Sequence, residues 1–307
     1  MNNVSNSTAG FSKPSVLDKI SVWLPKIVVG PTFLIMVVFV YGFILWNGYL
    51  SFSKSRLLPN YDWAGLKAYK TLFSLERWDV ASLNLVKFGC LFVLTCMVLG
   101  LLLAILLDQK IRAEGFLRTV YLYPMALSFI VTGTVWKWIL NPELGLEKFM
   151  NNLGFENFQF DWLVNPEFSI YTVVIAGMWQ STGFVMALFL AGLRGIDGEI
   201  IKAAQVDGAS LPTIYRRIII PSLRPVFFSV FIILLHIAIK SFDLIVALTS
   251  GGPGYSSDVP ATFMYTYSFS RGQIAVGSAS ATMMLLAIVA IIVPYLYSEL
   301  RQANNEH

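Results

Sequence analysis

Six long apolar segments constrain this chain more than any other feature of its sequence. A helix that crosses a bilayer needs about 20 mostly apolar residues, because the hydrocarbon core is about 30 Å thick. Segments of that length cover residues 27–50, 83–107, 117–140, 168–193, 222–248 and 274–298. Hydrophobic residues make up 56% of the chain and charged residues only 13%, whereas soluble domains carry roughly 25% charged residues. The sequence therefore predicts an all-α, polytopic membrane protein with about six transmembrane helices.

The distribution of lysine and arginine predicts how these spans are oriented. Cytoplasmic loops of membrane proteins carry an excess of these residues. Both terminal segments and the loops after the second and fourth spans together hold more of them than the other loops, although the loop from 51 to 80 is also basic. We therefore expect a cytoplasmic N-terminal tail over 1–26, a transmembrane domain over 27–299 and a cytoplasmic C-terminal tail over 300–307.

The segment between the fourth and fifth spans, residues 194–225, has the pattern of a polar helix-turn-helix. Glu199 to Val206 are mostly good helix formers, Gly208 permits a tight turn, and Pro212 suits the first turn of a second helix. Small alanines leave one side of this structure low in relief. Such a surface suits docking into a groove on a partner, but the residue types alone fit an ordinary cytoplasmic loop equally well.

The spacing in this segment resembles the EAA loop of permease subunits of binding-protein-dependent ABC importers. The family pattern is Glu-Ala-Ala, three residues, Gly, nine residues, then Ile-x-Leu-Pro. The matching residues are Ala203, Ala204, Gly208, Ile218 and Pro221, with Ile220 in place of Leu and Lys202 in place of Glu. Asn84 and Ser250-Gly251-Gly252-Pro253 resemble the carbohydrate branch, which includes maltose, glycerol-3-phosphate and glucose permeases. The resemblance covers about residues 27 to 300 and implies a location in the cytoplasmic (inner) membrane.

The resemblance implies that residues 194–225 form a coupling loop through which a separate ATPase drives transport. The contact residues that it implies are Glu199, Lys202, Ala203, Ala204, Asp207, Gly208, Ala209, Arg216 and Pro221. A lysine at position 202 would repel the basic ATPase residue that the family's Glu is expected to meet. Glu199, three residues earlier on the same helix face, could replace that Glu. Alternatively, a sister permease carries the intact Glu and dominates coupling.

The resemblance also implies the partners of this chain. They are two nucleotide-binding ATPase subunits, a second homologous permease subunit and an extracytoplasmic sugar-binding protein, in addition to membrane lipid. The sequence has no G-x-x-x-x-G-K-[ST] phosphate loop, so ATP and Mg²⁺ are expected on the ATPase, and this chain is expected to bind no cofactor and to be no enzyme. Two histidines and two cysteines indicate neither a metal site nor a disulfide framework. No basic run with interleaved aromatic residues indicates a nucleic-acid partner.

Polar residues inside the spans are candidates for the substrate path, because such residues usually face the bundle interior or a cavity. On the fourth span the candidates are Gly177, Gln180, Ser181 and Phe184, which share one helix face, and Trp179 beside Gln180. On the fifth span they are His236, Lys240, Ser241 and Asp243, of which His236, Lys240 and Asp243 share a helix face. Amide, hydroxyl and imidazole groups suit a neutral, hydroxyl-rich solute, and an aromatic ring can pack on a sugar. The alternatives are interhelical hydrogen bonds for Gln180 and Ser181 and a structural ion pair for Lys240 and Asp243.

Together these observations predict the permease subunit of an ATP-driven importer of a sugar, with glucose or a related small sugar as the most specific prediction. Lys240 and Asp243 would also suit proton coupling, so an ion-coupled secondary carrier is the alternative. The sequence does not decide whether this subunit or its permease partner holds the main sugar site.

Overall fold

The computed structural model describes residues 16–109 and 111–305 of the chain. Within these residues the secondary structure consists of helices and one isolated antiparallel bridge, between Ser53 and Trp63. The expected all-α class is therefore confirmed. The chain divides into two compact units, residues 1–49 and 50–307.

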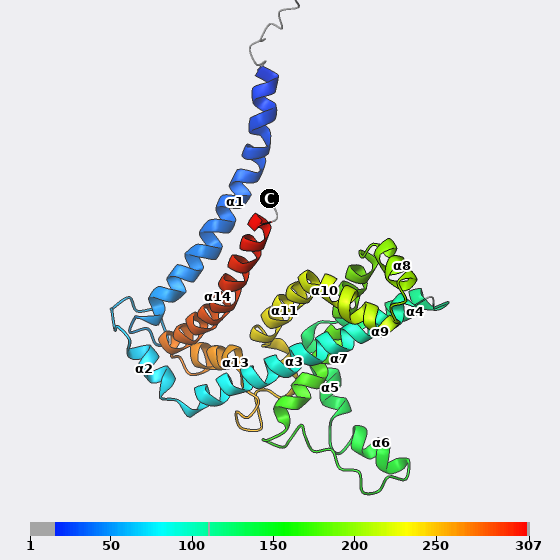
Figure 1. Cartoon of the computed structure of the whole chain (residues 1–307). Coiled ribbons are helices and arrows are strands. Elements are labelled where there is room, and N and C mark those ends of the chain that lie inside the picture. Colours follow the sequence, from blue (N-terminus) through cyan, green and yellow to red (C-terminus); the bar gives the residue numbers. More distant parts are fainter. Residues whose placement is uncertain (1–15, 110, 306–307) are drawn as a thin grey trace, which may run out of the picture. The chain divides into compact units, whose positions relative to one another are not determined.

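The first unit is formed by α1 (Val16–Ser51), of which it holds the part up to Tyr49 (Figure 1). The segment Val28–Ser51 is long and apolar enough to span a membrane, as expected for residues 27–50. Its large apolar side chains are mostly exposed, which suits contact with lipid. The helix begins before this segment, inside the expected tail, of which residues 1–15 lie outside the described residues.

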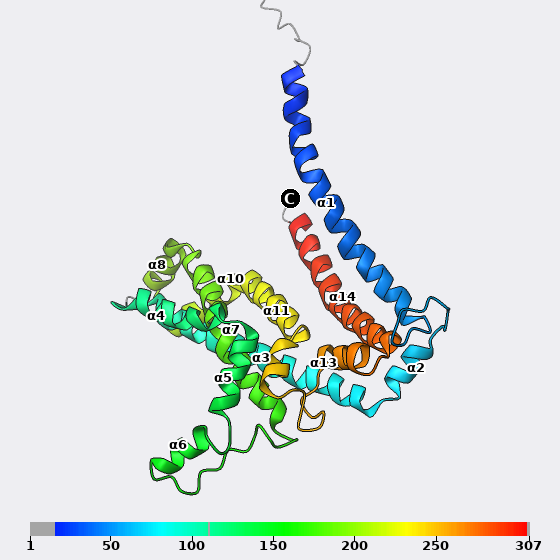
Figure 2. The same cartoon turned by 180° about the vertical axis from the view of Figure 1, so that it is seen from behind.

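Three continuous helices of the second unit are also long and apolar enough to span a membrane. They are α3 (Glu76–Asp108), α7 (Ser169–Arg194) and α14 (Ile274–Asn305), the last over Ile274–Pro294. Figures 1 and 2 show α3 and α7 side by side. They can approach closely because position 100 of α3 is glycine, where a Cβ would lie 2.5 Å from Cγ1 of Val185. Membrane helices use small residues in this way, since packing must drive association where lipid supplies no hydrophobic effect.

The expected third span, residues 117–140, is broken. α4 (Glu114–Leu122) continues into a 3₁₀ turn, η1 (Tyr123–Ala126), and α5 (Phe129–Ile139) follows at an angle of 100°. Pro124 is the second residue of η1 and lacks the N–H that a continuing α-helix would need. Ser128 then caps α5, because its side chain accepts a hydrogen bond from the Val131 amide at 3.3 Å. The expectation of one continuous helix is wrong here for these two local reasons.

The expected fifth span, residues 222–248, is also divided. A helical stretch that begins before it, in the segment 194–225, comprises α9 (Leu211–Ile214), the π-helical turn η2 (Tyr215–Ile219) and α10 (Ile220–Ser222), and α11 (Arg224–Ile239) follows at 62°. After α11 ends, α12 (Asp243–Leu248) forms a separate helix. If each bent pair counts as one span, the described residues hold six candidate spans, which agrees with the expected number.

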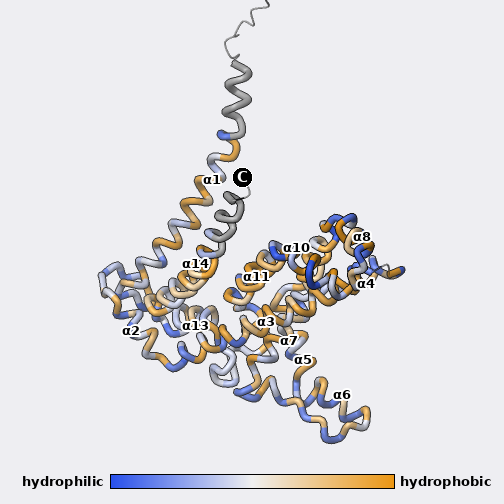
Figure 3. The backbone as a smooth tube through the Cα atoms, viewed as in Figure 1, coloured by the Kyte–Doolittle hydropathy of each residue, from blue (hydrophilic) through white to orange (hydrophobic). Residues whose placement is uncertain are grey.

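Short helices complete the second unit. They are α2 (Lys67–Phe73), α6 (Leu146–Asn152), α8 (Gly198–Val206), α13 (Pro260–Tyr265) and the π-helical turn η3 (Thr266–Ser270). α14 reaches Asn305, so most of the segment expected as a C-terminal tail is helical. Figure 3 shows hydrophobic residues concentrated along α3, α7 and α11, and hydrophilic residues around α8.

Two hydrophobic clusters hold the second unit together. The larger one is built mainly from α3, α7, α11 and α12 and includes Phe92, Val185 and Leu244. The smaller one joins Trp78 of α3 to Phe263 of α13, together with residues of α2 and α14. Residues of the coupling loop pack against the larger cluster, so the loop and the path candidates on α7 share one core.

Candidate functional site

The coupling loop, residues 194–225, folds as the helix-turn-helix that its sequence predicts. Asp197 caps α8, because its side chain accepts a hydrogen bond from the Glu199 amide at 2.9 Å. The turn after α8 passes through Gly208, whose φ of 79° lies in the left-handed region that favours glycine. Pro212 stands in the first turn of α9, where its missing N–H leaves no helical hydrogen bond unmade.

The helix α8 has an inner face that packs on its own subunit and an exposed outer face. Ile201 and Ala204, with Ala209 just beyond the helix, are partly buried against the larger hydrophobic cluster. The outer face carries at helical spacing the exposed residues Glu199, Lys202, Ala203 and Val206. Two of the expected contact residues, Ala204 and Ala209, therefore support the loop from inside.

Exposed apolar side chains on this polar loop were missed by the sequence analysis. Val206 is 88% exposed, and Ile200 and Leu211 are 52% and 61% exposed. Exposed apolar groups gathered on one surface can mark an interaction site. Of the other expected contact residues, Asp207, Gly208 and Arg216 are exposed and Pro221 is partly buried. These apolar residues could have been found in the sequence, because they interrupt an otherwise polar segment.

Arg194, the last residue of α7, connects the base of the coupling loop to two other helix ends. Its guanidinium forms an ion pair with Glu114 at the start of α4 and lies 3.8 Å from a carboxylate oxygen of Asp108 at the end of α3. All three side chains are partly exposed, and such pairs contribute about 0–1 kcal/mol each. These contacts therefore orient the loop more than they stabilise the fold.

Gln180 lies near the middle of α7 and is buried. Its Nε2 donates a hydrogen bond at 2.7 Å to the carbonyl oxygen of Leu127, in the break between η1 and α5. A carbonyl at a break inside a membrane needs such a partner, because lipid cannot hydrogen-bond it. This contact is the interhelical bond that the sequence left as the alternative. Oε1 of Gln180 is buried without a hydrogen-bond partner among the described residues.

The other path candidates on α7 differ in their surroundings. Trp179 is 39% exposed and packs edge-to-face on Trp136 of α5, with ring centroids 5.9 Å apart. Ser181 is buried, and Phe184 is partly buried. The aromatic side chains of Trp179 and Phe184 are therefore more exposed than the polar side chains of Gln180 and Ser181.

Gly177 is a site of close helix packing. A Cβ at this position would lie 3.4 Å from Phe92 of α3 and from Leu244 of α12. That distance is an ordinary van der Waals contact, so the position tolerates little beyond a methyl group. Gly177 therefore faces neighbouring helices in this structure.

The candidates on the fifth span are separated by the end of α11. Lys240 follows the last residue of α11 and Asp243 opens α12, so the predicted common helix face with His236 is wrong. A cation at a helix C-terminus and an anion at an N-terminus both complement the helix dipole, which suits a break between these charges. The ion pairs of the described residues do not join Lys240 to Asp243, and both side chains and His236 are exposed. Ser241 is buried and donates to the carbonyl oxygen of Ile237 at 2.9 Å.

Asn84 and the glycine-rich loop, residues 249–259, are in direct contact, although they were noted separately in the sequence. Asn84 of α3 is buried, and its Nδ2 donates to the carbonyl oxygens of Ser256 at 2.7 Å and Asp258 at 3.0 Å. Within the loop, the Ser257 hydroxyl donates to the carbonyl oxygen of Gly252 at 3.0 Å. A core helix therefore holds this loop in one position.

Arg77 holds the same loop through a buried ion pair with Asp258. Only 1% of the Asp258 side chain is exposed. Burial raises the pKa of Asp258, and the Arg77 guanidinium opposes that rise. Breaking a buried pair costs about 3–5 kcal/mol, because the remaining charge is left without a partner. The sequence analysis missed this role, since it counted Arg77 only as a charge of the loop from 51 to 80.

The part of the chain that carries the coupling loop and the glycine-rich loop matches a known family. The family model described as binding-protein-dependent transport system inner membrane component covers residues 96–302. The chain belongs to this family. It is therefore an inner-membrane, multi-pass component of a binding-protein-dependent transport system.

Individual proteins are similar over most of their length. A probable ABC transporter permease of Pyrococcus horikoshii is 40% identical over 269 residues, which cover 87% of this chain and 92% of the relative. The xylose/arabinose import permease of Haloferax volcanii is 38% identical over 279 residues, covering 90% and 87%. A crystal structure of a bacterial ABC transporter involved in the import of the acidic polysaccharide alginate matches with a TM-score of 0.80 at 21% identity, covering 93% of this chain and 98% of that one. The last match shows the fold alone, and none of the three supports an ion-coupled carrier.

Proposed function

We propose that this chain is the permease subunit of an ATP-driven importer that carries glucose or a related small sugar across the inner membrane. The observation that carries the proposal is membership of the binding-protein-dependent family together with 38% identity to a xylose/arabinose import permease. The path candidates include no arginine, which favours a neutral sugar over an anionic one because arginine is the usual partner of carboxylates and phosphates.

The proposed importer combines this chain with a second homologous permease, two ATPase subunits and an extracytoplasmic sugar-binding protein. The exposed outer face of α8, with Val206 at its end, supports an ATPase contact at this surface. ATP binding would close the ATPase subunits, move the coupling loop and switch the path from inward-facing to outward-facing. Arg77 and Asn84 fix the glycine-rich loop through an ion pair and two hydrogen bonds. This supports a role for the loop as a rigid element at the outer end of the transport path, where the binding protein would dock.

The surroundings of Gln180 support a sugar path beside the break in the third span. A small shift of α5 would release its Nε2 from Leu127, and its Oε1 already lacks a partner among the described residues. Such an amide could then donate to one sugar hydroxyl and accept from another. Trp179 precedes Gln180 on α7 and packs on Trp136. A turn of this part of α7 toward the path would offer an aromatic ring for the apolar side of a sugar.

Uptake by the reconstituted importer tests this proposal. The complete complex is placed in proteoliposomes with its binding protein and offered radiolabelled glucose, xylose and maltose, with ATP supplied on the side of the ATPase subunits. We expect ATP-dependent uptake of glucose or xylose that persists when a proton gradient is dissipated. Uptake that requires the proton gradient and not ATP, or uptake of maltose without glucose or xylose, contradicts the proposal.

The charges on the outer face of α8 lead to a more specific prediction about coupling. If Glu199 replaces the family's carboxylate, Glu199→Lys places two cations opposite a basic residue of the ATPase. Like charges across an interface cost several kcal/mol, so sugar-stimulated ATP hydrolysis should fall at least about tenfold. Lys202→Glu is the matched control and should be tolerated. Near-normal stimulation in Glu199→Lys would assign coupling chiefly to the second permease.

A further inference from the structure

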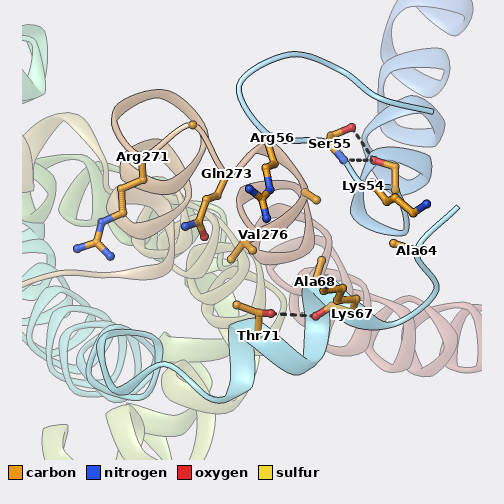
Figure 4. A pocket seen from close by; sticks show the side chains of 13 residues that line it. Lys54, Ser55, Arg56, Ala64, Lys67, Ala68, Thr71, Arg271, Gln273 and Val276 are labelled. Atoms are coloured by element: carbon orange, nitrogen blue, oxygen red, sulfur yellow. Dashed lines mark hydrogen bonds between the residues drawn. The ribbon is translucent and has the colours of Figure 1, made fainter. Parts of the chain in front are cut away.

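A cavity of about 530 Å³ lies between residues 53–56, α2 and the start of α14 (Figure 4). Its walls are fixed by backbone hydrogen bonds, because the amides of Ile274 and Ala275 donate to the carbonyl oxygens of Arg56 and Ser55 at 3.3 and 3.2 Å. The Ser53 and Ser55 hydroxyls also bond to each other at 2.6 Å. The cavity is therefore a built feature of the fold and belongs to neither the coupling loop nor the path candidates.

Four cationic side chains line this cavity, and none of its lining residues carries a carboxylate. Two of the four have partners elsewhere. Lys54 lies 3.7 Å from a carboxylate oxygen of Asp62, and Arg271 donates to the Tyr267 hydroxyl at 2.8 Å. A cavity of this charge favours an anionic occupant.

The remaining two cations, Arg56 and Lys67, have no ion pair among residues 16–109 and 111–305. Both are exposed. Figure 4 shows the Arg56 guanidinium directed into the cavity near the Gln273 side chain, above Val276 and Thr71. The Arg56 guanidinium and the Gln273 amide thus lie close together, and Lys67 lines the same cavity from α2. Cationic and amide donors around one cavity suit the oxygens of a phosphate group.

The surroundings of the cavity indicate where this anion comes from. Leu57, Leu58, Tyr61 and Trp63 follow or face its lining segment and are each more than half exposed. Basic side chains beside exposed apolar and aromatic ones are typical of the membrane–water interface. Gln273 directly precedes Ile274, the first residue of the candidate span in α14. The cavity therefore lies at the level of the lipid headgroups, a layer about 5–7 Å thick on each side of the hydrocarbon core.

We propose that this cavity binds the phosphate of an anionic phospholipid headgroup, with Arg56 and Lys67 as its principal partners. A soluble protein would approach from beyond the headgroup layer and would leave the exposed leucines and aromatic side chains in water. A lipid places its phosphate in the cavity and its acyl chains against these apolar groups at the same time. The bound lipid would fix residues 53–56 against α14 at the end of the span.

Lipid binding to the assembled importer tests this proposal. The dissociation constant of the tightest phosphatidylglycerol site is measured by native mass spectrometry on the purified complex in detergent, with phosphatidylcholine as the neutral comparison. The double variant Arg56→Gln/Lys67→Gln should bind phosphatidylglycerol about twenty-five-fold more weakly, at about a fivefold loss for each cation near the headgroup. The matched control, Lys70→Gln/Lys148→Gln, removes the same charge from exposed residues outside the cavity and should change the constant less than twofold.

The outcomes separate a lipid from an acidic protein partner. Wild-type phosphatidylglycerol binding in the double variant overturns the proposal. If the variant keeps phosphatidylglycerol binding but loses affinity for the binding protein in nanodiscs made only of phosphatidylcholine, the cavity is instead a docking site for acidic residues of that protein. An equal loss of phosphatidylglycerol binding in the control pair also contradicts the proposal, because it would reflect net charge and not this cavity. An unchanged thermal midpoint of the double variant shows that a loss of lipid binding does not come from misfolding.

Discussion

Gly208→Trp should abolish sugar-stimulated ATP hydrolysis, by at least about a hundredfold, while the importer still assembles in the membrane. Gly208 is exposed at the turn between α8 and α9, and a Cβ there would meet no other atom within 4 Å. The subunit itself can therefore accommodate a larger side chain. An indole at the tip of the coupling loop would instead collide with any partner seated on the outer face of α8. ATP hydrolysis by the purified complex, with and without loaded binding protein, measures the loss.

Gly208→Ala is the matched control for this prediction. Both substitutions place a Cβ on a residue whose φ is 79°, which costs about 1–2 kcal/mol for a residue other than glycine. Only tryptophan adds bulk. We therefore expect Gly208→Ala to retain most of the stimulated hydrolysis. Equal loss in both variants would place the effect in the backbone of the turn, and wild-type hydrolysis in Gly208→Trp would show that the ATPase contact lies elsewhere.

Features with local signals could be predicted from the sequence. The fourth span was expected over residues 168–193, and α7 covers Ser169–Arg194, because about 20 apolar residues in a row are sufficient evidence for a membrane helix. The turn of the coupling loop followed in the same way from Gly208 and Pro212. In these cases the residues that specify the structure are neighbours along the chain.

The breaks in the third and fifth spans could not be predicted from hydropathy, since a run of apolar residues does not distinguish one straight helix from two bent halves. The signals were weaker and lay in single residues. Pro124 and Ser128 mark the break before α5, and Lys240 and Asp243 mark the end of α11 and the start of α12. A proline inside an apolar run is compatible with a kink as well as with a break.

The contacts of the candidate site were the least predictable part, because they join segments far apart in the sequence. Gln180 bonds a carbonyl that is free only because the third span breaks there. Arg77 and Asp258 are 181 residues apart, so nothing in either local sequence indicates the other. The residues themselves could be selected as polar and near a span, but their roles depend on partners that the fold supplies.

Gly183→Ala should lower the stability of the subunit strongly, and much more than Gly177→Ala on the same helix. A Cβ at position 183 would overlap the carbonyl oxygen of Tyr121, at the end of α4. The obstacle is backbone, so no side-chain rotation can relieve it, and α7 must move away from α4 and η1. Overpacking usually costs about 1–3 kcal/mol, and the upper end or more is expected here. For a chain of this length, 3 kcal/mol corresponds to a fall in the unfolding midpoint of about 5 °C.

Gly177→Ala supplies the matched control on the same helix. Its Cβ would lie 3.4 Å from Phe92 and Leu244, which is ordinary contact, so the midpoint should change by no more than about 2 °C. Both variants add one methyl group to a buried glycine of α7, and helix propensity favours alanine over glycine at each site. Only the approach of α7 to Tyr121 distinguishes them. Equal midpoints for the two variants, measured by thermal unfolding of the purified complex in detergent, would show that α7 and α4 do not pack this closely. A lower midpoint in Gly183→Ala alone would instead show that the backbone of the bent third span packs directly on α7, in addition to the hydrogen bond from Gln180 to Leu127.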